Sequence, residues 1–71
     1  MSRYAINSVL YRLKKDPEFR ARFEADPRVA LADADLTEAE RAAFAAHDVR
    51  RINELGGYLH LVMSVPGLAA H

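Results

Sequence analysis

The stretch LTEAERAAFAAHD, residues 36–48, carries the clearest folding signal in the chain. Thr37 followed by Glu40 is a capping box, in which each side chain accepts a hydrogen bond from the backbone N–H of the other residue. Leu36 precedes the box in the position of a hydrophobic staple. Phe44 is the main apolar side chain of the segment, and it stands among alanines of high helix propensity. The stretch therefore predicts a short amphipathic helix with a sharply defined start.

Upstream, the chain is divided into short helices by similar signals. Apolar residues at positions i, i+3, i+4 and i+7 predict a first helix from about Tyr4 to Lys14. Its buried stripe consists of Ile6, Val9, Leu10 and Leu13. The pairs Asp16-Pro17 and Asp26-Pro27 each offer an N-cap followed by proline at the first helical position. They predict a second helix that buries Phe19 and Phe23 and a third that carries Val29 and Leu31.

Downstream, Asp48 can cap a fifth helix that runs through Val49, Ile52 and Leu55, with Gly56 as its C-cap. The last residues differ, because Gly56-Gly57 is followed by the β-favouring residues Tyr58, Val62 and Val65, and Pro66 stops any helix. We therefore predict an all-α fold, an irregular cluster of about five short helices in residues 1–57. Residues 58–71 are expected to form an extended apolar tail.

Composition limits the classes of function. The 71 residues suffice for one small domain, which a partner or self-association would help to stabilise. Ten basic and ten acidic residues give no net charge, so nucleic acid and membranes are not expected partners. There is no cysteine, hence no disulfide and no thiolate metal site, and no run of about 18 apolar residues that could span a membrane. A cytoplasmic location is expected.

Chemistry for catalysis is missing from the pattern. His47, His60 and His71 have no metal-ligand spacing, and the serines lack the context of a nucleophile elbow. Arg50 and Arg51 are adjacent on a helix and point in different directions, so they are more often solvated than gathered on one anion. We expect no catalysis by this chain alone and no cofactor bound to it.

The order of these helix signals resembles a known family. The tandem Asp-Pro breaks, the LT-x-x-E opening at 36–40, the Asp48 cap and ELGG at 54–57 resemble the small, LigA-type subunit of protocatechuate 4,5-dioxygenase and its relatives. In such enzymes the larger subunit holds the iron ligands and the base, and the small subunit covers the active-site cleft. The resemblance implies a non-catalytic chain whose partner is a dioxygenase large subunit with non-haem Fe(II).

A second group shares this helical domain, the split type of borosin precursor proteins. In these, a LigA-like leader precedes a short apolar core peptide, and a separate enzyme methylates backbone amides of the core with S-adenosylmethionine. HLVMS at 60–64 resembles such a core, and DVRRINELGG at 48–57 resembles a double-glycine leader end, although Gly56 as a plain helix cap explains the glycines as well. Stand-alone dioxygenase subunits usually continue with His-Pro and a Leu-rich helix, which are absent here. The precursor is our first interpretation and the dioxygenase subunit the alternative.

The precursor interpretation makes the tail a substrate. Residues two apart in an extended segment present their amides in the same direction, so Leu61 and Met63 are the expected methylation sites, with Val62 next. A last strand or turn packed on the helices is the plain alternative. The residues expected to bind the partner are Phe19, Phe44, Arg50, Arg51 and Tyr58. The partner would be an α-N-methyltransferase in a hetero-oligomer, or alternatively the dioxygenase large subunit.

Overall fold

Six helices and their connections make up residues 2–68, the part of the chain that the computed structural model describes. They are α1 (Ser2–Lys15), α2 (Pro17–Ala25), α3 (Pro27–Ala30), α4 (Glu38–Ala45), α5 (Val49–Glu54) and α6 (Leu59–Ser64). The described residues contain no strand, which confirms the all-α class. The first five helices correspond to the predicted ones, and α6 was not predicted. His71 lies outside the described residues.

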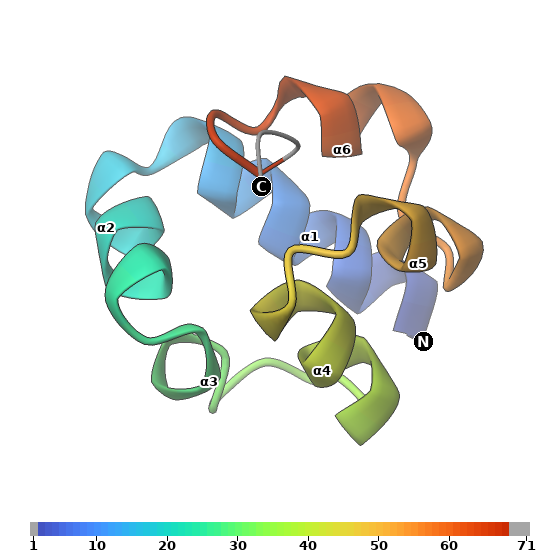
Figure 1. Ribbon diagram of the computed structural model, residues 1–71, viewed down its shortest axis with the longest axis horizontal. Helices are drawn as coiled ribbons and strands as arrows, with labels where there is room; N and C mark the ends of the chain where they lie inside the picture. The colour runs from blue at the N-terminus through green and yellow to red at the C-terminus, as the bar shows by residue number, and fades with distance from the viewer. Residues whose placement is uncertain (1, 69–71) are drawn as a thin grey trace.

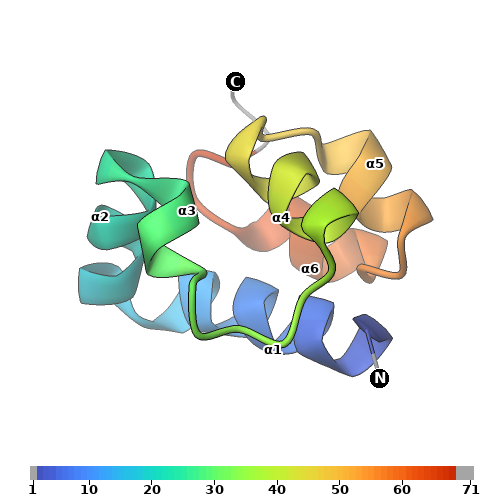
Figure 2. The same ribbon diagram turned by 90° about the horizontal axis from the view of Figure 1, so that it is seen from below.

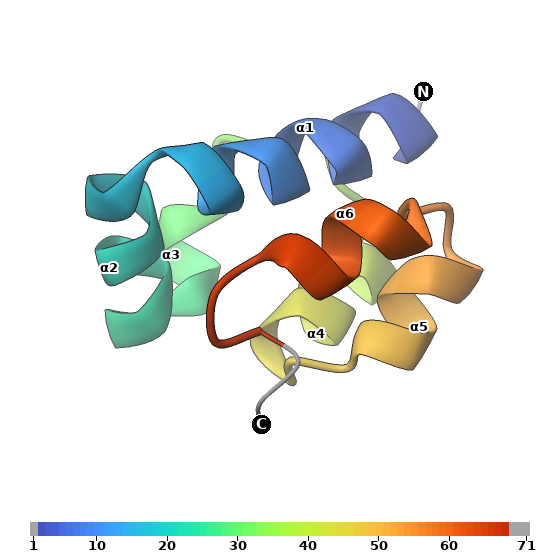
Figure 3. The ribbon, with the colours of Figure 1, turned by 90° about the horizontal axis from the view of Figure 1, so that it is seen from above.

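The helices form a closed ring. Each packs against the next one along the chain, and α6 returns to pack against α1 (Figure 1). The long helix α1 lies along one side, with α2 and α3 at one end and α4 and α5 opposite it (Figure 2). Seen from the other side, α6 lies alongside α1 and next to α5 (Figure 3). The C-terminal segment is therefore the element that closes the ring.

Local side-chain caps start the helices, as the sequence predicts. Asp16 Oδ1 accepts from the Phe19 N–H at 3.1 Å, and the same arrangement recurs at Asp26 and Asp48. In the capping box, Thr37 Oγ1 accepts from the Glu40 N–H at 3.2 Å, and Glu40 Oε1 accepts from the Thr37 N–H at 2.7 Å. These bonds satisfy N–H groups that have no partner within a helix, so the starts of α2, α3, α4 and α5 are fixed by residues within one turn.

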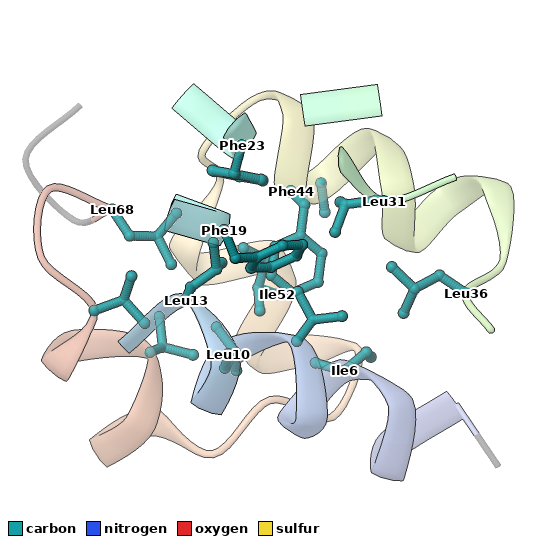
Figure 4. Packing of buried hydrophobic residues seen from close by; sticks show 14 residues of the cluster. Ile6, Leu10, Leu13, Phe19, Phe23, Leu31, Leu36, Phe44, Ile52 and Leu68 are labelled. Carbon is teal, nitrogen blue, oxygen red and sulfur yellow. The ribbon is translucent and has the colours of Figure 1, made fainter. Parts of the chain in front are cut away.

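The interior is filled from every part of the ring. The rings of Phe23 and Phe44 meet edge to face with centroids 6.4 Å apart and join α2 to α4 (Figure 4). The buried apolar residues are Ile6, Val9, Leu10, Leu13, Phe19, Phe23, Leu31, Leu36, Ala43, Phe44, Ile52, Val62, Val65 and Leu68. The predicted stripe of α1 is entirely in this core. Val29 is exposed, so of the two apolar residues predicted for the third helix only Leu31 is buried.

The glycine pair after α5 has a structural role. Gly56 has a φ of 128° and Gly57 donates its N–H to Ile52 O, which together form a Schellman-type helix end. A Cβ on Gly57 would lie 2.9 Å from Ile52 Cγ2 and 3.1 Å from Leu10 Cδ1. Close packing of the linker on α1 and α5 therefore requires glycine at position 57, independently of any role of the pair in processing.

The extended tail predicted from residue 58 is wrong for residues 59–64, which form α6. Residues 55–58 link α5 to α6 through the turn at Leu55 and Gly56, and α6 ends at Ser64, two residues before Pro66. Val62, Val65 and Leu68 recur at intervals of three and are all buried. The burial of these side chains outweighs the modest β-propensity of valine, because propensity is a weaker term than packing in the core.

Candidate functional site

The aromatic residues divide sharply between the interior and the surface. All three phenylalanines are buried, whereas all three tyrosines are exposed: Tyr4 by 78%, Tyr11 by 57% and Tyr58 by 59%. An exposed tyrosine offers a large rigid apolar ring with a hydroxyl that bonds to water or to a partner. Such residues are enriched in protein–protein interfaces, so their distribution identifies a candidate binding surface.

The three tyrosines line one shallow groove between α1 and the start of α6. We call this depression, lined by Arg3, Tyr4, Asn7, Ser8, Tyr11, Tyr58 and Leu61, the tyrosine groove. Tyr4 and Tyr11 are seven residues apart and therefore lie on the same face of α1, two turns from each other. Because the opposite face of α1 carries the buried stripe, packing of the core turns both rings outward.

Asn7 holds the two sides of the groove together. Its Nδ2 donates to Gly56 O at 3.1 Å and to Arg3 O at 2.9 Å, and its Oδ1 accepts from the Tyr58 N–H at 2.8 Å. One amide side chain thus binds both the carbonyl and the N–H of the linker before α6. This pairing fixes the position of Tyr58 beside α1 and makes Asn7 a positioning residue of the surface.

A second groove lies on the other flank of α1, between it and the α2–α3 segment. Its volume is about 690 Å³, and Val9, Phe19 and Val29 contribute to its apolar walls. Its charged lining consists of three carboxylates, Asp26, Asp33 and Asp35, and two guanidinium groups, Arg12 and Arg22. We call it the α1–α3 groove. It shares Tyr4 and Ser8 with the tyrosine groove, so the outer face of α1 separates the two depressions.

Of the predicted partner-binding residues, only Tyr58 lies on the tyrosine groove. Phe44 is a core residue that meets Phe23, and Phe19 is buried beneath the guanidinium of Arg12, 4.0 Å above its ring. Both phenylalanines are thus core residues, and Phe19 also contributes to a wall of the α1–α3 groove; their part in partner binding stays a prediction. They are buried because each follows its helix cap on the face that turns inward.

Arg50 and Arg51 lie on α5, away from both grooves. The Arg50 side chain is 90% exposed and contacts Glu54 at 3.9 Å, while Arg51 contacts the same carboxylate group at 3.5 Å. The structure does not bring these two arginines together with Tyr58 into one site. Surface ion pairs of this kind contribute about 0–1 kcal/mol, so their removal leaves the fold intact.

The predicted modification residues occupy three different environments on α6. Val62 is completely buried, Leu61 is half-buried at the edge of the tyrosine groove, and Met63 is 57% exposed. The Val62 N–H donates to Tyr58 O at 2.9 Å as the first hydrogen bond of the helix. Leu61 and Met63 therefore do not present their amides side by side as they would in an extended strand.

The polar groups below the surface do not converge on a reaction centre. His47 Nε2 lies 3.7 Å from Glu24 Oε1, and the imidazole packs at 5.3 Å on Phe23. Among residues 2–68, no group of three or more His, Asp or Glu side chains is arranged to hold a metal ion. Within the same range, no helix has both the length and the apolar character needed to cross a membrane.

Sequence reasoning missed Tyr4, Tyr11 and Asn7. The signal for the tyrosines was available, because they lie opposite the apolar stripe of a helix that has a clear polar face. No sequence signal indicated Asn7, since its partners are 49 and 51 residues away. That contact depends on the return of α6 to α1.

Comparison with known proteins finds a family match that includes all or part of each of the six helices. A family model described as "Aromatic-ring-opening dioxygenase LigAB, LigA subunit" matches residues 6–69. The matched range includes α6, so the segment predicted to be a separate tail lies within the family domain. No curated protein and no solved structure matched the chain. With a match over most of its length, the chain belongs to the LigA family of aromatic-ring-opening dioxygenase subunits.

Proposed function

We propose that this chain is a non-catalytic subunit that binds a larger enzyme chain through the tyrosine groove. The favoured partner is the large subunit of an aromatic-ring-opening dioxygenase, which would supply non-haem Fe(II) and the reacting groups. Family membership supports this partner. The observation that carries the proposal is the gathering of all three tyrosines of the protein on one exposed face.

The size of the surface is consistent with such a role. A standard protein–protein interface covers about 800 Å² on each partner. The accessible surface of this chain is 4433 Å², so an interface of that size occupies one of its faces. Tyr4, Tyr11, Tyr58 and Leu61 in the groove offer apolar contacts on such a face. Truncation of a central tyrosine in an interface typically costs about 2 kcal/mol or more of binding free energy.

The test is co-expression of the chain with the large subunit of an extradiol dioxygenase, followed by co-purification and an assay of ring opening. We expect a stable complex and higher activity of the pair than of the large subunit alone. The variant Tyr4→Ser/Tyr11→Ser should weaken the complex at least tenfold without loss of helical circular dichroism. Arg50→Ser/Arg51→Ser removes two exposed side chains of α5 and serves as the matched control.

Two results would contradict this proposal. One is that the large subunit does not bind this chain and that its ring-opening activity is the same with and without this chain. The other is a complex that tolerates the tyrosine changes and is lost in the arginine control, which would move the interface to α5.

A second candidate function is that of a borosin-type precursor whose α6 segment is methylated by an S-adenosylmethionine-dependent α-N-methyltransferase. The observation that favours it is the weak start of α6, where Tyr58 provides no side-chain cap. The Leu61 N–H lies in the first turn, where helical N–H groups have no intrahelical partner. Methylation of Val62 requires loss of its hydrogen bond to Tyr58 O, so α6 must unwind before that amide reacts.

This candidate is tested by co-expression with such a methyltransferase and tandem mass spectrometry of residues 58–71. The helix geometry predicts that Leu61 is modified before Val62 and Met63. An unmodified segment in the presence of a methyltransferase proven active on another substrate excludes the precursor function. Methylation together with failure to bind a dioxygenase subunit would make the precursor the better interpretation.

A further inference from the structure

Positive charge without a neutralising carboxylate gathers on the helix that carries the tyrosine groove. Helix α1 has four basic residues, Arg3, Arg12, Lys14 and Lys15, and no acidic residue. Arg12 contacts Asp16 at 3.8 Å. Within the described part of the chain, Arg3, Lys14 and Lys15 form no ion pair, whereas Arg28, Arg50 and Arg51 on other helices do. The other arginines without an ion pair have other partners: Arg20 and Arg41 donate to backbone carbonyl groups, and Arg22 lies over the Phe19 ring.

Arg3, Lys14 and Lys15 flank the tyrosines. Arg3 lines the groove near Tyr4. Lys14 and Lys15 follow Tyr11 by three and four residues, and this spacing places them on the same face of α1, one turn further along. The tyrosine rings are thus bordered by positive charge at both ends of the helix.

The acidic and basic residues of the protein lie in different parts of the chain, although the net charge is zero. Eight of its ten carboxylates lie between Asp16 and Glu40, in the segment that contains α2 and α3. No carboxylate lines the tyrosine groove, and α6 contains none. The prediction that nucleic acid and membranes are not partners was made from the sum of the charges, and the structure adds their arrangement.

We propose that the tyrosine groove binds an acidic segment of a partner protein, with apolar side chains over the tyrosine rings and Asp or Glu side chains beside Arg3, Lys14 and Lys15. This inference rests on the proposed function and adds the chemistry of the surface that the partner presents. The charge arrangement favours a short acidic protein segment over a nucleic acid. On the other flank of α1, the carboxylates of Asp26, Asp33 and Asp35 in the α1–α3 groove outnumber its two guanidinium groups, Arg12 and Arg22, and this excess of negative charge disfavours an extended polyanion.

Complementary charge acts mainly on the rate of association. Steering by a patch of one sign raises association rate constants by factors of about 10 to 1000, and salt removes the effect. Reversal of the charges of Lys14 and Lys15 should therefore slow association at low ionic strength, while contacts of the tyrosines continue to determine dissociation.

The experiment measures association and dissociation rates of the full chain with the isolated dioxygenase large subunit at low and high ionic strength. Lys14→Glu/Lys15→Glu should reduce the association rate constant about tenfold at low salt. The difference should vanish at high salt, with little change in dissociation. Arg50→Glu/Arg51→Glu makes the same change of charge on α5 and should leave the rates unaltered. Both lysines are exposed, so melting temperatures of the variants should stay near that of the wild type.

Each alternative outcome has a distinct meaning. Tight binding that does not depend on salt overturns the acidic-partner inference and leaves the proposed function standing. The same holds if Arg50→Glu/Arg51→Glu reduces the association rate constant as much as Lys14→Glu/Lys15→Glu does. Absence of binding by the wild type to the large subunit and to the α-N-methyltransferase overturns both. Binding of equal strength to phosphatidylserine vesicles or to a single-stranded oligonucleotide would identify the ligand of this surface as a lipid or a nucleic acid and overturn the inference. Concentration-dependent self-association through the same lysines would identify it as a second copy of this chain.

Discussion

The substitution Val62→Ala tests whether the C-terminal segment is part of the core. Val62 is 0% exposed on α6, whereas Met63, the next residue, is 57% exposed on the same helix. Alanine removes two carbon groups from the interior, and at about 0.8 kcal/mol per group this costs about 1.6 kcal/mol of transfer free energy. The cavity that remains adds to the cost, and the higher helix propensity of alanine offsets about 0.5 kcal/mol.

We therefore expect Val62→Ala to lower the free energy of unfolding by about 2 kcal/mol. In a domain of this size that loss corresponds to a melting temperature lower by about 8–16 °C. Met63→Ala is the matched control and should cost less than about 0.5 kcal/mol, since surface changes are usually small. Urea denaturation followed by circular dichroism measures both, and the m-values should equal that of the wild type.

The two results together discriminate between the folded and the extended segment. If residues 58–71 form a free tail in solution, both substitutions leave the free energy of unfolding unchanged within error. Equal midpoints for Val62→Ala, Met63→Ala and the wild type would refute the packing of α6 against α1 and α5.

Three further predictions concern the ring. Gly57→Ala should destabilise the protein by about 1–3 kcal/mol, because the added Cβ meets Ile52 and Leu10; an unchanged thermal midpoint would show that the linker packs less closely. Asn7→Ala should lower the free energy of unfolding by about 1–2 kcal/mol, because its hydrogen bonds to the linker are lost. Ser8→Ala changes an exposed neighbour on α1 and should leave that free energy nearly unchanged, as measured by urea denaturation. Phe23→Ala should lower the free energy of unfolding by about 3–5 kcal/mol and Thr37→Ala by about 1 kcal/mol. A calorimetric melting temperature lower for Thr37→Ala than for Phe23→Ala would contradict the assignment of core and cap.

Much of the helical pattern could be read from the sequence because its causes are local. The caps at Asp16, Asp26, Thr37 and Asp48 join groups three residues apart, so each signal lies within a few letters. The Ile6-to-Leu13 stripe also lies within two turns of one helix. For the candidate site, the sequence predicted Tyr58, which lines the tyrosine groove.

The C-terminal segment shows where local reasoning fails. Its valines, glycines and proline favour an extended chain, and Tyr58 gives α6 no side-chain cap. The energy that makes it helical comes from burial of Val62, on the helix that packs against α1 and α5, and from burial of Val65 and Leu68 after it. No local pattern in the sequence describes these long-range contacts. The free energy gained by long-range packing therefore exceeds the local preference of this segment for an extended conformation.

By itself, the sequence determined an all-α chain, the start of each capped helix and the inward face of α1, because hydrogen bonds and periodicity within one or two turns fix these features. Only the tertiary structure decided that α6 closes the ring and that Asn7 joins α1 to the linker. The tyrosine groove exists for the same reason: Tyr4 and Tyr58 are distant in the chain, and only the packing of α6 on α1 brings them to one surface.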